Sequence, residues 1–296
     1  MFLIFVLYFV WALLLFVNQE IVELCTRPFF VGGLRSVLAG LLMLLYSFCI
    51  QGARIKPRDL SRTEWMIVML CGIMLYGIAA SGFSLGLDYT TPIVAAFIYS
   101  VAPFITAGLM YFIYNEKLSI KKTAGLVIGF VSVLGVVLTD SSCSLEQGSF
   151  AGAAIFFSST FLFCYAWILF KDIIANRPKS ILLLNSLAMI FGGAVALLFA
   201  VLCKVTDGSM ISLFFDHGLL LTLFVVLTAV GYGLYSYLLG IYSPTLLSFA
   251  GFLDPMFGVL LGILFFGHCF YPVYLASFAG LAVGLYIFYR DELKMS

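Results

Sequence analysis

Long apolar segments and short polar gaps alternate along the whole chain. Ten segments of roughly twenty residues are almost entirely apolar, and most charged residues lie between them. A bilayer core about 30 Å thick is crossed by roughly 20 helical residues, so each segment is long enough to span it. Because the apolar residues do not alternate with a period of two, the pattern predicts helices and not a membrane β-barrel. The expected spans are residues 2–22, 28–50, 64–87, 92–114, 122–139, 149–171, 180–203, 217–240, 244–267 and 271–289.

The prolines indicate that the chain is one folding unit written twice. Pro92 and Pro103 lie eleven residues apart in one apolar segment, and Pro244 and Pro255 repeat that spacing 152 residues further on. The flanking sequence LGLDYTTP, which ends at Pro92, also resembles LGIYSP, which ends at Pro244. A duplicated set of membrane segments with interrupted helices is typical of carriers.

Each predicted half holds five spans, an odd number, so the second half crosses the bilayer in the opposite sense. We therefore predict an all-α polytopic membrane protein with ten transmembrane helices in two inverted five-helix repeats, residues 1–140 and 148–290. Pro103 and Pro255 are expected to break the fourth and ninth helices, which would then act as gating walls. The alternative, that these prolines only kink their helices, stays open.

Composition agrees with a chain that is surrounded by lipid. Hydrophobic residues make up 64% of the sequence and charged residues 10%, and the mean hydropathy is +1.16. This leaves far too little polar surface to cover a water-soluble globule. We expect no soluble domain beside the ten spans.

The basic residues indicate the orientation. If the amino terminus is cytoplasmic, twelve Lys and Arg residues fall on the cytoplasmic side, whereas only Arg27 and Lys204 fall on the other. This asymmetry predicts that both termini are cytoplasmic, in a multi-pass protein of the bacterial cytoplasmic (inner) membrane. The first apolar run has no preceding Lys or Arg and no small-residue cleavage site, so we expect a retained helix and not a secretory signal.

Several classes of function are disfavoured. A net charge of +1 without a basic tract argues against nucleic acid as a partner. The seven cysteines are scattered without a zinc-binding spacing, and His217 and His268 lie apart from each other, so we predict no metal site and no hydrolytic triad. There is no phosphate-binding loop of an ATPase. We expect neither a cofactor nor an enzyme.

Two charged residues are expected deep in the hydrocarbon region, away from the ends of their spans: Arg35 and Asp254. A charge at the centre of a membrane helix costs about 2.5 to 3.5 kcal/mol, so each residue needs a partner or water. Arg35 either forms a structural ion pair, extends to the interface, or receives a substrate carboxylate. Asp254 precedes Pro255, whose missing amide frees a backbone carbonyl nearby, and it is a candidate for binding a cationic centre or a proton.

Aromatic residues in the same spans provide flat surfaces that stack on a base or shield a cation. Most of them are expected to pack or to anchor the helices, and about a third to contact ligand. Asn185 is added because it follows Pro178 by seven residues, as Arg35 follows Pro28. Beside Arg35 and Asp254, the candidate substrate-binding residues are Trp11, Tyr99, Tyr165, Trp167, Asn185, Tyr232 and Tyr235.

The sequence from residue 85 to residue 140 resembles the first-half signature of the drug/metabolite transporter superfamily, in particular its ten-helix EamA-type members. The similarity lies in LGLDYTTP, in Pro103, in Asn115–Ser119 (NEKLS) and in the glycine-rich segment 125–135. Arg35 is similar to the arginine that these proteins carry in their second helix, and Trp11-Ala12 stands where many have Trp-Gly.

The resemblance implies two inverted halves around a cavity that is lined chiefly by the third, fourth, eighth and ninth helices. It also implies a second-half acidic residue opposite Glu116, but His268 stands at that position, so a role for such an acid is in doubt. The superfamily includes carriers of amino acids, nucleotide sugars, sugar phosphates and S-adenosylmethionine.

We therefore expect a secondary transporter that works by alternating access as a monomer or homodimer. A carboxylate for Arg35, a cation for Asp254 and a flat ring for the aromatic residues together describe S-adenosylmethionine and its demethylated product, although plain amino acids fit nearly as well. A proton-driven exporter of amino acids is the alternative within the class. An intramembrane lipid-modifying enzyme and a channel are alternatives outside it, but no cluster of polar pairs, polar stripe or filter-like loop supports them.

Overall fold

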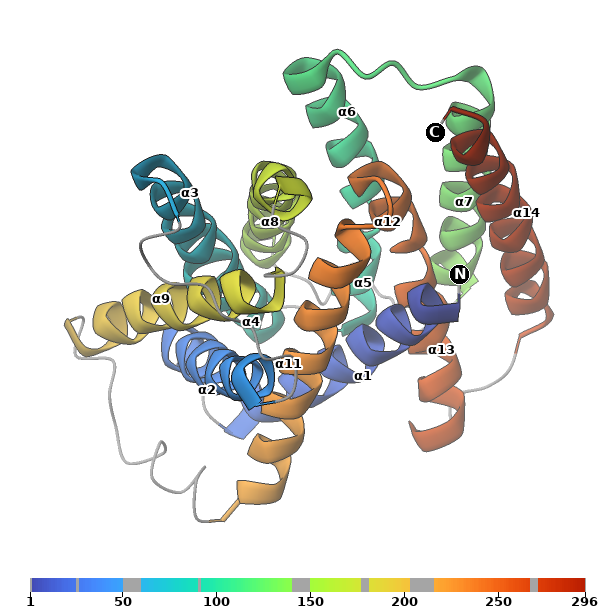
Figure 1. The fold of residues 1–296 in the computed structure, drawn as a ribbon. Coiled ribbons are helices and arrows are strands. Elements are labelled where there is room, and N and C mark those ends of the chain that lie inside the picture. Colours follow the sequence, from blue (N-terminus) through green and yellow to red (C-terminus); the bar gives the residue numbers. More distant parts are fainter. Residues whose placement is uncertain are drawn as a thin grey trace.

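The computed structural model describes residues 2–24, 27–49, 60–89, 92–139, 150–176, 181–202, 216–266 and 271–295. Within these ranges all regular structure is helical (Figure 1). The helices are α1 (Phe2–Leu24), α2 (Pro28–Cys49), α3 (Arg62–Gly72), η2 (Ile73–Ala79), α4 (Ala80–Asp88), α5 (Pro92–Tyr99), α6 (Ala102–Tyr114), α7 (Ile120–Thr139), α8 (Phe150–Asn176), α9 (Ile181–Leu202), α11 (Gly218–Leu239), α12 (Pro244–Ala250), α13 (Leu253–Phe266) and α14 (Pro272–Met295).

The helices confirm a polytopic helical membrane protein. In the described part of the chain, nine helical stretches are long and apolar enough to cross a membrane, and the predicted span 122–139 lies within α7. The largest differences from the predicted limits lie at the ends of α8 and α14, which continue to Asn176 and Met295. Apolar length measures the part of a helix inside lipid, whereas its last turns can extend into water.

Two of the membrane-crossing helical stretches, called crossings below, are broken at their middle, as the prolines predict. They are α5 with α6 and α12 with α13. Ser100 and Val101 separate α5 from α6, and Pro103 occupies the first turn of α6, where a missing amide costs nothing. Gly251 and Phe252 separate α12 from α13 in the same way, with Pro255 in the first turn of α13. Each break therefore ends one short helix and starts another inside the apolar region.

The third crossing contains a feature that the sequence pattern did not predict. It starts with a capping box, in which Ser61 and Glu64 satisfy each other's backbone amides, and continues through α3 into the π-helix η2. Single π-helical turns often accompany functional sites. Here η2 packs against α9, and the Tyr76 hydroxyl donates to Asn185 Oδ1.

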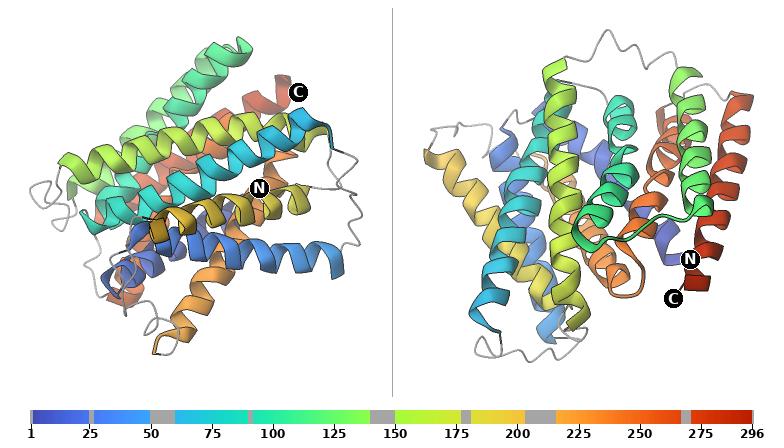
Figure 2. Two further views of the ribbon diagram at one scale, coloured as in Figure 1. Left: turned by 90° about the vertical axis from the view of Figure 1, so that its left-hand side faces the viewer. Right: turned by 90° about the horizontal axis from the view of Figure 1, so that it is seen from above.

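Helices from the two halves of the chain lie side by side. The first crossing, α1, lies against α11 and α13, and α8 lies against α4 and α6. Close pairs are also formed by α2 with α9 and by α7 with α14 (Figures 1 and 2). In the α7–α14 pair a Cβ on Gly125 would lie 3.0 Å from the Gly284 carbonyl oxygen, so these glycines let the two backbones approach closely.

Candidate functional site

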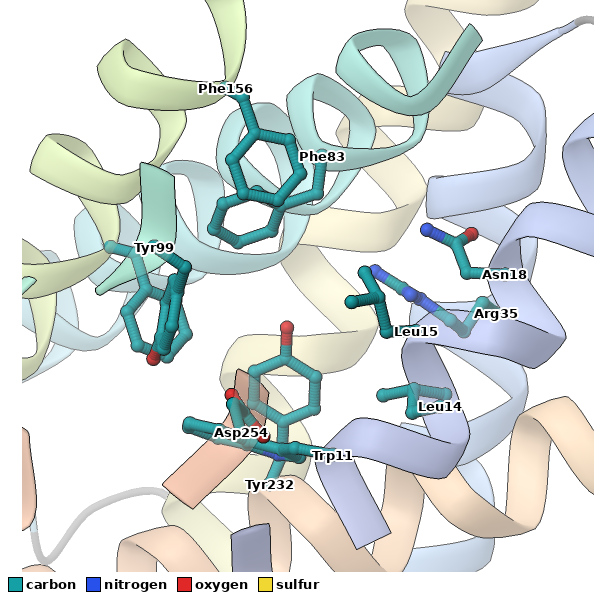
Figure 3. A pocket seen from close by; sticks show the side chains of 11 residues that line it. Trp11, Leu14, Leu15, Asn18, Arg35, Phe83, Tyr99, Phe156, Tyr232 and Asp254 are labelled. Carbon is teal, nitrogen blue, oxygen red and sulfur yellow. The ribbon is translucent and has the colours of Figure 1, made fainter. Parts of the chain in front are cut away.

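A pocket opens where the first crossing meets both broken helices (Figure 3). The space free of protein atoms amounts to about 600 Å³, part of it open to the outside. Its walls come from α1, α2, α4, α5, α8, α11 and α13. The lining residues are Trp11, Leu14, Leu15, Asn18, Arg35, Phe83, Tyr99, Phe156, Phe163, Tyr232 and Asp254.

Arg35 reaches this pocket from the first third of α2. Its side chain is only 3% exposed, and its Nε and Nη2 atoms have no hydrogen-bond partner among the described residues. The guanidinium carbon lies 4.9 Å from the centroid of the Phe224 ring, which partly offsets the charge. A buried arginine with two unpaired nitrogens lacks hydrogen bonds that water would supply, so it can bind an anion strongly.

Asp254 reaches the same pocket from the first turn of α13. Its backbone amide donates to the Gly251 carbonyl oxygen at 3.0 Å, which holds the residue at the helix break. Its Oδ1 atom is buried without a hydrogen-bond partner in the described structure. In the view of Figure 3 Asp254 and Arg35 lie on opposite sides of the hollow. The pocket therefore carries two groups of opposite charge that other side chains leave unsatisfied.

Trp11 is the centre of the aromatic wall. Its ring centroid lies 5.7 Å from that of Phe163, 6.1 Å from that of Tyr232 and 6.2 Å from that of Tyr99. Its indole Nε1 atom is buried without a hydrogen-bond partner in the described part. The wall can stack on a planar ligand or contact a cation.

The structure thus brings five of the predicted substrate-binding residues to one pocket: Trp11, Arg35, Tyr99, Tyr232 and Asp254.

The other four predicted residues do not line this pocket. Tyr235 stacks behind Trp11 with ring centroids 5.1 Å apart, and Trp167 lies behind Tyr235 at 4.6 Å. Asn185 is fully buried, with its amide nitrogen donating to the Tyr232 carbonyl oxygen at 3.1 Å, and so supports the wall from outside. Tyr165 is partly buried against the apolar core.

The sequence analysis missed the other lining residues, which are Leu14, Leu15, Asn18, Phe83, Phe156 and Phe163. The resemblance implied walls from the third, fourth, eighth and ninth crossings, but α1 contributes four lining residues and α2 and α8 contribute more. Spacing could have identified the α1 residues, since Leu14, Leu15 and Asn18 follow Trp11 by three, four and seven positions and share its helix face. The aromatic residues Phe83, Phe156 and Phe163 carried no signal that separated them from other phenylalanines.

Within the described ranges, no three His, Cys, Asp or Glu side chains come together in a way that could hold a metal ion. His268 lies outside the described residues.

Comparisons with known proteins identify relatives of the chain. Residues 1–138 match the EamA-like transporter family. The chain is 29% identical to the S-adenosylmethionine/S-adenosylhomocysteine transporter of Chlamydia trachomatis serovar L2, over 99% of this chain and 90% of that protein. It is 28% identical to the protein of the same name from Chlamydia muridarum, over 99% of this chain and 92% of that protein. One solved crystal structure shares the fold, with a TM-score of 0.70 and 13% identity, over 100% of this chain and 96% of that chain. The resemblance to EamA-type transporters is therefore confirmed.

Proposed function

We propose that this EamA-like chain is a secondary transporter that exchanges S-adenosylmethionine for S-adenosylhomocysteine across a membrane by alternating access. The relatives that match nearly its whole length carry the name of such a transporter. The observation that carries the proposal is the pocket in which Arg35 and Asp254, both with unpaired polar atoms, face one hollow among aromatic rings.

The pocket offers a counterpart for each part of this ligand. Arg35 binds the carboxylate, and Asp254 attracts a positive centre, either the sulfonium or the amino group. The rings of Trp11, Tyr99 and Tyr232 stack on the adenine base or face the sulfonium cation. S-adenosylhomocysteine lacks one methyl group and the sulfonium charge but keeps the rest of the shape, so the same apolar walls accept it.

Contacts between the halves support two inverted repeats, residues 1–140 and 148–290. If the first five crossings are exchanged with the last five, the contact of α1 with α11 becomes that of α8 with α4. The contact of α2 with α9 is unchanged by this exchange, because the two helices replace each other. A pseudo-twofold relation of this kind lets the two halves rock about a shared site, with the broken crossings α5–α6 and α12–α13 as moving walls.

The excess of basic residues in alternate loops supports an orientation with both termini in the cytoplasm. The bacterial relatives support the cytoplasmic (inner) membrane of a bacterium as the location. We propose that a single chain or a homodimer suffices for transport, because the pocket is built from one chain.

Counterflow in proteoliposomes tests the exchange. Vesicles that are loaded with unlabelled S-adenosylhomocysteine should take up labelled S-adenosylmethionine without a proton gradient, whereas empty vesicles should not. The label should be recovered chemically unchanged, which separates a carrier from an enzyme.

Uptake that needs a proton gradient and accepts plain amino acids equally well would instead support the amino-acid exporter. Gly108→Ala is a suitable control variant, since a Cβ at Gly108 would meet nothing within 4 Å and the residue does not line the pocket.

A further inference from the structure

Asn18 is a further polar side chain that faces the pocket, beside Arg35 and Asp254. It lies on the first crossing and is 3% exposed. The Ser84 hydroxyl shares its proton between the Asn18 Oδ1 atom at 3.1 Å and the Ala80 carbonyl oxygen at 3.3 Å, with Oδ1 turned towards Ser84. Figure 3 shows the amide nitrogen on the side of the pocket. The side chain therefore presents N–H donors, and no negative charge, to a ligand.

Asn18 and Arg35 lie at the same depth. Asn18 precedes the end of α1 at Leu24 by six residues, and Arg35 follows the start of α2 at Pro28 by seven. At a rise of 1.5 Å per residue, both side chains start about 10 Å from the same end of the bundle. In the view of Figure 3 they extend into the pocket from the same side. One anionic group of a ligand can then meet both.

We propose that Asn18 is a specificity-determining residue that donates a hydrogen bond to the ligand carboxylate bound by Arg35. This inference rests on the proposed function, because it concerns the same pocket and ligand. A carboxylate has two oxygens and about four lone-pair directions, more than a single guanidinium satisfies. An amide that Ser84 holds in place supplies a further donor without adding charge. A ligand without the carboxylate would leave these buried donors unpaired, which is an effective way to reject it.

A pair of ligands that differ only in the carboxylate tests the assignment. Unlabelled S-adenosylmethionine and its decarboxylated analogue compete with labelled S-adenosylmethionine for uptake into proteoliposomes that contain the full chain. In the wild type the carboxylated compound should compete at a concentration at least tenfold lower. This preference should fall roughly tenfold in Asn18→Ala, and further in Asn18→Asp, which places a negative charge against the carboxylate.

The neighbouring residue provides a matched control. Gln19→Ala makes the same amide-to-alanine change one position further along α1, on a residue outside the pocket, and should keep the wild-type preference. If the Asn18 variants weaken both competitors equally, Asn18 has only a structural role and the inference is wrong, although the exchange function stands. The wild-type comparison needs no variant. Equal competition by the two compounds would overturn the inference and the role of Arg35 in binding the carboxylate, whereas the exchange function would stand. Absence of any wild-type uptake would overturn the proposed function and the inference with it.

Discussion

Single residues decide what the pocket can bind, because each buried polar atom without a partner requires one from the ligand. Arg35 presents two such nitrogens. Hydrogen bonds to a charged group contribute about 1.5–3 kcal/mol each, so Arg35→Ala should weaken S-adenosylmethionine binding at least tenfold. Arg35→Lys keeps the charge but not the planar fork, and should retain an intermediate affinity. The apparent affinity in counterflow measures both effects, and an unchanged value in Arg35→Ala would remove this residue from the site.

Asp254→Asn tests which positive centre this carboxylate faces. S-adenosylmethionine and S-adenosylhomocysteine share the amino group, and only the former carries the sulfonium. If Asp254 contacts the sulfonium, the neutral variant should lose roughly tenfold in affinity for S-adenosylmethionine and little for S-adenosylhomocysteine. Binding of both labelled compounds to the purified variant measures the difference. Equal losses would place the amino group at Asp254, and unchanged binding of both would leave only a proton-carrying role.

The same residues show how far sequence identifies a site. Arg35 and Asp254 stand out because charges are rare in apolar spans, and Trp11 stands out as a large amphipathic ring. Tyr235 and Trp167 have the same chemistry but lie behind the wall, because the rotation of each helix about its axis is set by packing. In the sequence Asn18 is distinguished only as a lone amide in an apolar segment. The direction of its side-chain amide follows only from its contact with Ser84 in the structure.

At the scale of the helices, close approach of backbones holds the crossings in place. A Cβ at Gly192 in α9 would lie 1.9 Å from the Gly72 carbonyl oxygen at the end of α3. Gly192→Ala should therefore force the helices apart and destabilise the fold by about 1–3 kcal/mol, as other overpacked positions do. A lower temperature of unfolding in detergent measures the effect. Gly108→Ala makes the same substitution in open space, and an equal loss there would show that the close contact is not responsible.

The positions of the helices and of their breaks were predicted better than the residues that line the site. Apolar length locates the crossings because lipid thickness is constant, and Pro103 and Pro255 locate the breaks because a proline cannot continue a helix without loss of a hydrogen bond. The π-helix η2 could not be predicted, since it arises where the third crossing packs against α9. No local pattern in residues 73–79 specifies that contact.

At the scale of the whole molecule, the pocket lies towards one membrane face, and hydrogen bonds between the two halves of the chain lie towards the other. Phe83 precedes the end of α4 by five residues and Phe156 follows the start of α8 by six, so both lie near the face at which α1 ends. Towards the opposite face the Tyr8 hydroxyl donates to the Leu247 carbonyl oxygen, and the Thr106 hydroxyl donates to Ser248 Oγ at 2.9 Å. We propose that, with the amino terminus in the cytoplasm, these contacts close the carrier on the cytoplasmic side.

Thr106 and Ser248 join the two broken crossings, α6 and α12, on that closed side. Alternating access requires these short helices to separate when the pocket opens to the cytoplasm, so a covalent link between them should stop transport. The two side-chain oxygens are close enough for sulfur atoms in their place to form a disulfide, so Thr106→Cys with Ser248→Cys is the variant to make. Cys164 lies within hydrogen-bonding reach of Thr106, and Cys164→Ala is needed in the background.

Oxidation of this double variant should reduce counterflow to the background rate, and a reducing agent should restore it. Ligand binding to the oxidised protein should remain, since the pocket on the other side stays accessible. Each single cysteine variant controls for damage by the oxidant. If the linked protein exchanges substrate at the rate of the reduced protein, α6 and α12 do not separate during transport. The closed side would then have to open elsewhere, through movement of crossings that this link does not hold.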